Sequence, residues 1–136
     1  MKVNRHQIRE LAFQTLFALE SNDEINVDEC FHYITKNDAN EIPDYYHELV
    51  FGVREHQSEI NEAIQPLLDS KWVVSRLNKA DLIILQLAFY EMKFVDDVPA
   101  KVSINEALEL AKKFSDDKSV NFINAILDKN MKKNPD

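Results

Sequence analysis

The sequence contains one glycine in 136 residues, and Gly52 lies inside an apolar stretch with helical spacing. Phosphate-binding loops need several glycines, because their backbone adopts positive φ angles and approaches the phosphate closely. A P-loop or a dinucleotide-binding turn is therefore excluded. Prolines number only four. Scarce glycine and proline favour long helices over a sheet with many turns.

Cysteine is as rare as glycine, since Cys30 is the only one. An intrachain disulfide and a clustered cysteine metal site are therefore excluded. The chain lacks an uncharged apolar run long enough to cross a membrane. Its first residues also lack the apolar segment and the cleavage site of a signal peptide. We expect a cytoplasmic protein that does not associate with membranes.

Positive charge is scarce in the middle of the chain. The formal net charge is −8, and residues 20–62 carry twelve acids against two cations. Residues 1–9 carry three cations and no acid, while residues 100–136 carry seven lysines against six acids. The total charge argues against nonspecific nucleic-acid binding. Its distribution allows a polyanion to contact the two ends while the middle repels it.

Apolar residues recur with the three- and four-residue spacing of one helical face along most of the chain. The pattern predicts an all-α protein of about seven helices and no strand. We expect one domain over residues 1–136, with an N-terminal helical half of about 1–70 and a C-terminal helical half of about 71–132. The helices are predicted at 4–20, 28–36, from Pro43, from Ser58, at 79–94 as the central buried helix, from Ser103 and from about 120.

Several helix ends have recognisable signals. Ser58 is predicted to cap the helix that follows it, and Pro66 predicts a kink or an early end of that helix. Ser103 and Glu106 have the spacing of a capping box, in which the serine accepts from the Glu106 N–H and the glutamate reaches back. This spacing predicts that a helix begins at Ser103.

Groups that could support catalysis or bind a metal are scattered. The four histidines lack the H-E-x-x-H spacing of a metal site. Asp28 and His32 lie one turn apart, and acids are paired at 96–97 and 116–117, but a solvated helix face and helix caps explain them more simply. Cys30 on an apolar helix face predicts a buried structural thiol. We predict that the protein is not an enzyme, with no catalytic residue, metal or cofactor.

Three segments carry a family pattern. Residues 9–17 read R-E-L-A-F-Q-T-L-F, close to R-E-x-A-x-Q-x-L-Y. Residues 81–91 read D-L-I-I-L-Q-L-A-F-Y-E and lead to Val98-Pro99. Residues 102–114 read V-S-I-N-E-A-L-E-L-A-K-K-F and precede F-I-N at 122–124. In this order the segments resemble the NusB (N-utilisation-substance protein B) family over nearly the whole chain.

The resemblance implies an all-α fold of two helical subdomains. It further implies transcription antitermination through binding of the boxA element in ribosomal-RNA leader transcripts, together with the ribosomal small-subunit protein NusE and within an RNA polymerase antitermination complex. A NusB-like RNA-binding domain of an rRNA methyltransferase is disfavoured, because the chain ends before a methyltransferase domain. A module that binds only proteins stays open, as does the choice between monomer and homodimer.

The resemblance places the RNA surface on the basic first helix and on the loop before the last helix. Arginine offers a planar fork to phosphate or a base edge, and we expect Arg9→Ala to weaken RNA binding without unfolding the chain. Phe122 is a stacking candidate, with core packing as the alternative. The predicted RNA-binding residues are Lys2, Arg5, His6, Arg9, Gln14, Phe17, Lys112, Lys113, Lys118, Ser119 and Phe122.

The same resemblance suggests a face for the protein partner. Asp81, Tyr90 and Glu91 match family positions on or near the surface that meets NusE. Acids suit this partner, because NusE is a basic ribosomal protein in the family and opposite charges steer association. The alternative is that these polar groups merely flank a buried helix.

Overall fold

The computed structural model describes residues 3–37 and 41–134, which form seven α-helices, two short 3-10 helices and no strand. The all-α prediction is therefore confirmed. The elements are α1 (Arg5–Ser21), α2 (Val27–Thr35), α3 (Asp44–Glu55), α4 (Gln57–Ile64), η1 (Gln65–Leu67), η2 (Val74–Arg76), α5 (Lys79–Phe94), α6 (Ala100–Phe114) and α7 (Asp117–Lys133).

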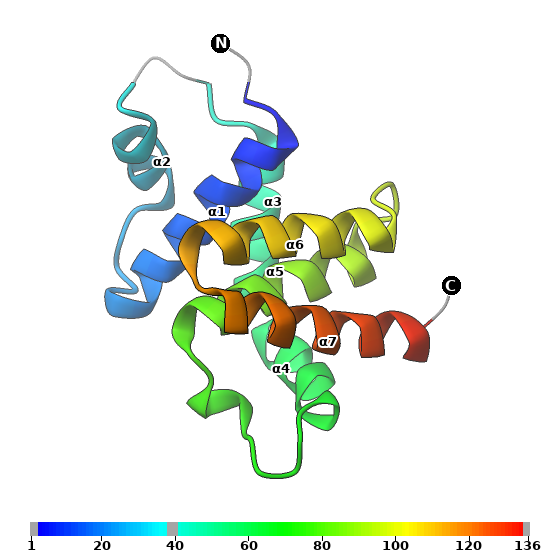
Figure 1. Cartoon of the computed structure of the whole chain (residues 1–136). Helices are drawn as coiled ribbons and strands as arrows, with labels where there is room; N and C mark the ends of the chain where they lie inside the picture. Colours follow the sequence, from blue (N-terminus) through cyan, green and yellow to red (C-terminus); the bar gives the residue numbers. More distant parts are fainter. Residues whose placement is uncertain (1–2, 38–40, 135–136) are drawn as a thin grey trace.

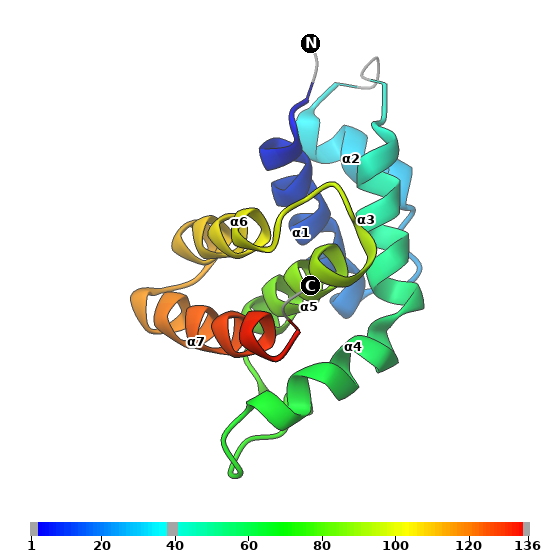
Figure 2. The ribbon, with the colours of Figure 1, turned by 90° about the vertical axis from the view of Figure 1, so that its right-hand side faces the viewer.

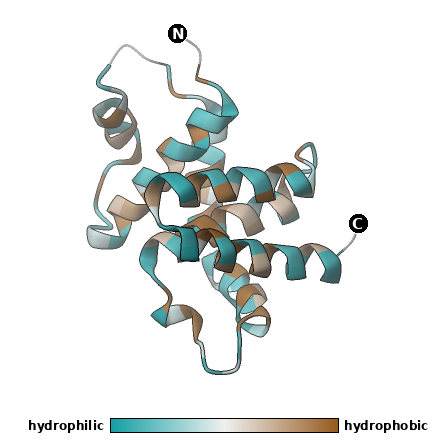
Figure 3. Ribbon diagram, in the orientation of Figure 1, coloured by the Kyte–Doolittle hydropathy of each residue, from teal (hydrophilic) through white to brown (hydrophobic). Residues whose placement is uncertain are grey.

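Helix α5 lies at the centre of the bundle, with α1 and α3 on one side and α6 and α7 on the other (Figures 1 and 2). Every residue from Ile83 to Glu91 is buried. A helix that is apolar on most sides has to be surrounded by other elements. Hydrophobic residues accordingly gather toward the middle, and hydrophilic ones cover the outer faces (Figure 3). Within the described ranges, no helix is both long and apolar enough to cross a membrane.

Asparagine and aspartate begin four of the helices. Asn4 forms a reciprocal capping box with Gln7, and Asn26, Asn78 and Asp116 each accept a backbone N–H of the helix that follows. These side chains satisfy amide groups that have no partner inside the first turn.

Proline marks other boundaries. Pro43 and Pro99 directly precede α3 and α6. Pro66 lies in η1, where the α-helix has already ended at Ile64, so the predicted early end is confirmed.

Three predicted helix starts are wrong. Helix α7 begins at Asp117 and not near 120. Helix α4 begins at Gln57 after His56, so Ser58 lies inside it. Helix α6 begins at Ala100, and Ser103 is a buried residue of the helix interior whose hydroxyl donates to Glu91 at 3.1 Å. The capping-box spacing predicted the wrong start, because the Ser103 hydroxyl bonds to the buried Glu91 carboxylate of α5 and does not cap a helix.

Gly52 of α3 lies against Tyr90 of α5. A Cβ atom at this position would lie 2.4 Å from ring carbons of Tyr90. The Tyr90 ring cannot withdraw easily, because it is buried and lies 5.1 Å from the Phe94 ring and 6.2 Å from the His56 ring. The single glycine of the chain therefore serves helix packing and not a turn.

We expect Gly52→Ala to destabilise the protein. The better helix propensity of alanine contributes about 1 kcal/mol, whereas overpacking costs about 1–3 kcal/mol, so a net loss of up to about 2 kcal/mol follows. Urea unfolding measures it, with Ser58→Ala on the exposed face of α4 as the control. Equal or higher stability of Gly52→Ala would show that the Tyr90 ring yields.

Candidate nucleic-acid interface

The first turn of α1 displays two of the predicted RNA-binding residues. Arg5 lies 4.1 Å above the Tyr45 ring and 3.4 Å from the Asp97 carboxylate. His6 Nδ1 lies 2.8 Å from Glu106 Oε1. Both side chains keep more than two fifths of their surface exposed, so they can exchange these partners for an anion. Lys2 lies outside the described residues.

Arg9, one turn further on, faces the interior. Its side chain is 7% exposed, and Nε donates to Glu91 Oε2 at 2.8 Å. The same carboxylate accepts from the Tyr45 hydroxyl and from Ser103 Oγ. Burial and the bond to Glu91 raise the pKa of Tyr45 far above its usual value, which keeps it a hydrogen-bond donor. In the folded protein the Arg9 guanidinium is therefore directed at Glu91 and not at solvent, while its contact with RNA stays a prediction.

The second half of α1 carries an exposed aromatic residue. Phe17 is 40% exposed, and Lys79 Nζ of α5 lies 5.8 Å from the centre of its ring. Gln14 is half-buried beside Tyr33 and His32 of α2, in a shallow open depression. Phe17 therefore offers a flat surface next to a cation, which suits an unpaired base.

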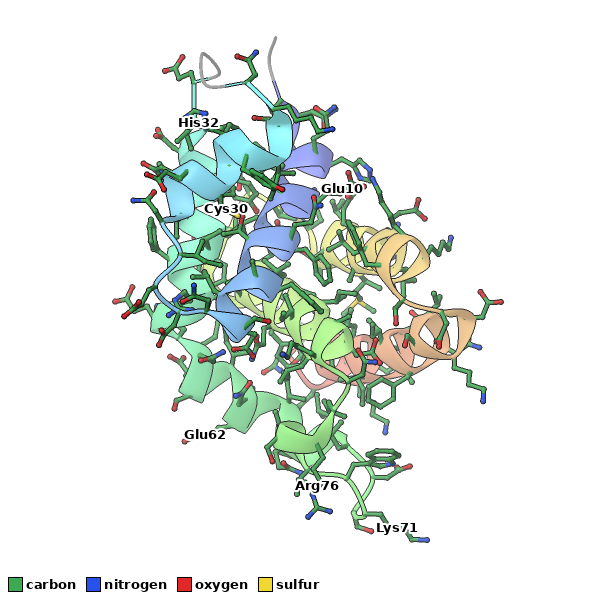
Figure 4. All side chains as sticks on the ribbon, turned by 90° about the vertical axis from the view of Figure 1, so that its left-hand side faces the viewer. Glu10, Cys30, His32, Glu62, Lys71 and Arg76 are labelled. Atoms are coloured by element: carbon green, nitrogen blue, oxygen red, sulfur yellow. The ribbon has the colours of Figure 1, made fainter. Side chains whose placement is uncertain are left out.

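The end of α6 packs onto α1. Phe114 stacks on Phe13 with ring centres 4.5 Å apart. Lys113 Nζ lies 3.1 Å from Glu10 Oε1, and Glu10 points from α1 toward α6 (Figure 4). Lys112 pairs with Glu109 on the exposed face. These contacts join two basic segments that lie about a hundred residues apart in the chain.

A buried carboxylate holds the junction between α6 and α7. Asp81 of α5 accepts from Ser115 Oγ at 3.1 Å and from Ser119 Oγ at 2.9 Å. Ser119 is buried, so its hydroxyl is not directed at an external ligand as the sequence suggested. Lys118, its neighbour, is exposed. We call Asp81, Ser115 and Ser119 the junction latch.

Asp116 caps the first turn of α7. Its carboxylate accepts the backbone N–H of Ser119 at 2.8 Å. This bond, and the Ser119 hydroxyl after it, hold the pKa of Asp116 below its usual value. The cap therefore contributes stability above the ordinary carboxyl pKa and loses it as the pH falls through the lowered value.

Four further predicted site residues are wholly or partly buried. Phe122 is half-buried against the core. Tyr90 and Glu91, predicted on the partner face, are 7% and 3% exposed, and Asp81 is 8% exposed. The burial of Asp81, Tyr90 and Glu91 fits the alternative reading, in which these polar groups stabilise the buried helix α5.

The scattered titratable groups do not assemble into a site. Asp28 contacts His47 at 2.6 Å, while His32 contacts the Asn37 carbonyl, so Asp28 and His32 do not act together. Residues 3–37 and 41–134 hold no group of three metal-binding side chains. Cys30 is only half-buried, against expectation, and Thr15 Oγ1 donates to its sulfur at 3.5 Å.

Sequence reasoning missed three residues of this region. Tyr45 and Ser115 bind the carboxylates of Glu91 and Asp81, and Lys79 lies over Phe17. Asp81 and Glu91 were visible as acids inside an apolar segment. A buried acid needs hydrogen-bond donors around it. The two acids were therefore a signal that donors such as Tyr45 and Ser115 would be found beside them.

We expect Arg9→Ala to unfold the protein more readily, because it leaves Glu91 as a buried charge without its cation. Loss of one partner of a buried pair costs about 3–5 kcal/mol. Thermal and urea unfolding measure the change. Arg5→Ala is the matched control, with an expected loss below about 1 kcal/mol. Equal stability of the two variants would contradict a structural role of Arg9.

The junction latch gives a second stability prediction. Asp81→Ala leaves the two serine hydroxyls with only each other, at a cost of about 1–3 kcal/mol. Amide hydrogen exchange should increase most at the start of α7. Asp69→Ala, on an exposed loop, is the control. Unchanged exchange in α7 would show that the latch does not hold the junction.

The chain matches known proteins over almost its full length. Residues 6–132 match a family model described as the NusB family. "Transcription antitermination protein NusB" of Lactiplantibacillus plantarum is 52% identical over 97% of both chains. The protein of the same name from Limosilactobacillus reuteri is 51% identical over 95% of this chain and 94% of its own length.

Solved structures agree with this match. NusB of T. maritima superposes with a TM-score of 0.84 at 32% identity, over 98% of this chain and 94% of that one. A chain from a crystal structure of antitermination factors NusB and NusE in complex with double-stranded RNA has a TM-score of 0.79 at 25% identity, over 95% of this chain and 96% of that one. The family model and the relatives above 50% identity together show that the chain belongs to the NusB family.

Proposed function

We propose that this protein is a transcription antitermination factor that binds boxA RNA of ribosomal-RNA leader transcripts together with NusE, within an RNA polymerase antitermination complex. Relatives above 50% identity bear the antitermination name. A structural neighbour is a NusB that was crystallised with NusE and RNA. Both support the proposal for this chain.

The observation that carries the proposal is the packing of α6 onto α1. The Phe13–Phe114 stack and the Lys113–Glu10 pair place the end of α6 beside α1. Cations and an exposed aromatic ring from both ends of the sequence therefore share one surface, which suits unpaired RNA. The proposed RNA surface consists of Arg5, His6, Gln14, Phe17, Lys112, Lys113 and Lys118, with the exposed part of Phe122.

Two of the residues that the resemblance suggested have supporting roles in this proposal. Arg9 fixes α1 against α5 through Glu91, and Ser119 fixes the start of α7 through Asp81. Lys118 then supplies the charge next to the helix N-terminus, where free N–H groups and the helix dipole favour a phosphate.

For the NusE face we propose an indirect role of Asp81, Tyr90 and Glu91. These residues are too buried to contribute much of a contact surface. They would instead hold in place the exposed residues that contact NusE. The acidic surface formed by residues 20–62 would steer a basic ribosomal protein toward the complex.

The proposed role requires no catalytic group, metal or cofactor, and we place the protein in the cytoplasm with the transcription machinery. Two alternatives give different binding results. A module that binds only proteins would bind NusE and no RNA. An RNA-binding domain of the methyltransferase type would bind rRNA without a preference for boxA.

The test is a titration of boxA RNA and a scrambled RNA, with and without NusE, at two salt concentrations. We expect a preference for boxA that NusE strengthens. Equal binding of both RNAs by the protein and by the complex would refute the proposal.

Lys118→Ala tests the proposed surface in the same assay. Loss of one phosphate contact should weaken boxA binding several-fold and reduce the slope of log K against log salt by about 0.7. Lys132→Ala, an exposed lysine near the other end of α7, is the control. If both variants bind equally well, Lys118 lies outside the interface.

A further inference from the structure

The connection between α4 and α5 displays the only tryptophan of the chain. Trp72 is 51% exposed, and Val73 beside it is 43% exposed. We call residues 69–79 the Trp72 loop. A large indole at the surface is a common anchor of recognition, because it offers a flat apolar face and loses little conformational freedom on binding.

Hydrogen bonds fix the backbone that carries this indole. Gln65 Nε2 donates to the Trp72 carbonyl at 2.9 Å, and its Oε1 accepts the Val74 N–H at 3.0 Å. The Trp72 N–H donates to the Asp69 carbonyl at 2.9 Å. A ligand would therefore meet an ordered loop, which lowers the entropy lost on binding.

Cations flank Trp72 along the chain. Lys71, Arg76 and Lys79 are exposed, and none forms an ion pair within the part of the chain that the structure describes. Asp69 is the only acid of the loop. Lys71 and Arg76 point into solvent at one end of the molecule (Figure 4). In a chain of net charge −8, such a concentration of positive charge with an exposed aromatic ring favours a nucleic acid.

The loop adjoins the proposed RNA surface at its C-terminal end. Lys79 ends the loop and lies 5.8 Å from the ring centre of Phe17. A cation of the Trp72 loop and an aromatic residue of the RNA surface are therefore direct neighbours.

Helix α7 makes a second connection. Lys118, Phe122, Ala125 and Lys129 are spaced along one helical face, and Lys129 Nζ donates to the Leu67 carbonyl just before the loop. Helix α7 contacts η1, and from there the connection extends away from the bundle (Figures 1 and 2). Two contacts therefore connect the proposed RNA surface with the Trp72 loop: Lys79 with Phe17, and Lys129 with the Leu67 carbonyl.

We infer that the Trp72 loop is a second RNA contact, which binds unpaired nucleotides that flank boxA. Trp72 stacks on a base, and Lys71 and Arg76 bind phosphates on either side. The inference rests on the proposed function, because boxA binding brings the flanking RNA to the loop. A basic protein such as NusE fits this surface less well, since like charges repel.

The single tryptophan provides a direct measurement. We compare a short boxA RNA with the same RNA extended on both sides by unpaired nucleotides, and follow tryptophan emission of the protein alone. The extended RNA should bind more tightly and quench Trp72, because stacking on a base quenches indole emission. The short RNA should bind without quenching.

Variants then separate stacking from charge. Trp72→Ala should weaken binding of the extended RNA by about tenfold and leave the short RNA unaffected. Arg76→Ala should reduce the salt slope for the extended RNA by about 0.7. The matched controls are Phe51→Ala, an aromatic residue that is 50% exposed on α3, and Arg54→Ala, an exposed arginine beside Glu20 and Asp23. Thermal unfolding confirms that each variant is folded.

Two results would overturn the inference, and a third would overturn the boxA function on which it rests. If the extended RNA binds no more tightly than the short one and leaves the emission unchanged, the loop does not contact RNA, and the proposed function stands. If Trp72→Ala lowers the affinity for NusE and not for extended RNA, the loop is a protein-docking surface. If the extended RNA quenches Trp72 while boxA and scrambled cores bind equally, the loop contacts RNA but the proposed boxA function fails.

Discussion

The arrangement of the bundle depends on the buried ion pair between Arg9 and Glu91. The Glu91 carboxylate from α5 receives Arg9 from α1, Tyr45 from α3 and Ser103 from α6. Apolar packing is tolerant of small shifts, whereas a buried charge has to keep its donors in place. The position of α6 relative to α1, on which the proposed RNA surface depends, is therefore set by hydrogen-bond geometry as well as by packing.

Local patterns were sufficient to predict most of the fold. The range 79–94 matches α5, because a long apolar segment without helix breakers has few alternatives. Pro66 also ended its helix as predicted. The start of α6 was wrong because the Ser103–Glu106 spacing is a local signal. The partner that decides the role of Ser103 is Glu91, twelve residues earlier on another helix. A capping motif can be read only when no tertiary partner competes for its serine.

The candidate site was less predictable than the fold. Arg5 and Arg9 lie one turn apart on the same helix, yet one is exposed and the other buried. The difference arises from the elements that pack over the second turn of α1, where Glu91 of α5 receives Arg9. Lys118 and Ser119 differ for a related reason, because only Ser119 faces Asp81. Residue type identified the candidates, and tertiary packing determined which of them a ligand can reach.

The junction latch has a consequence for how such a protein can vary. Asp81 holds Ser115 and Ser119, and so fixes the backbone at the start of α7, without using the side chain of residue 118. A substitution at 118 can therefore change the local charge while the helix start stays in place. The junction latch thus fixes the backbone at the start of α7, while residue 118 sets the local charge. A substitution at this one exposed residue can therefore change the affinity for a polyanion without requiring a second substitution in the core.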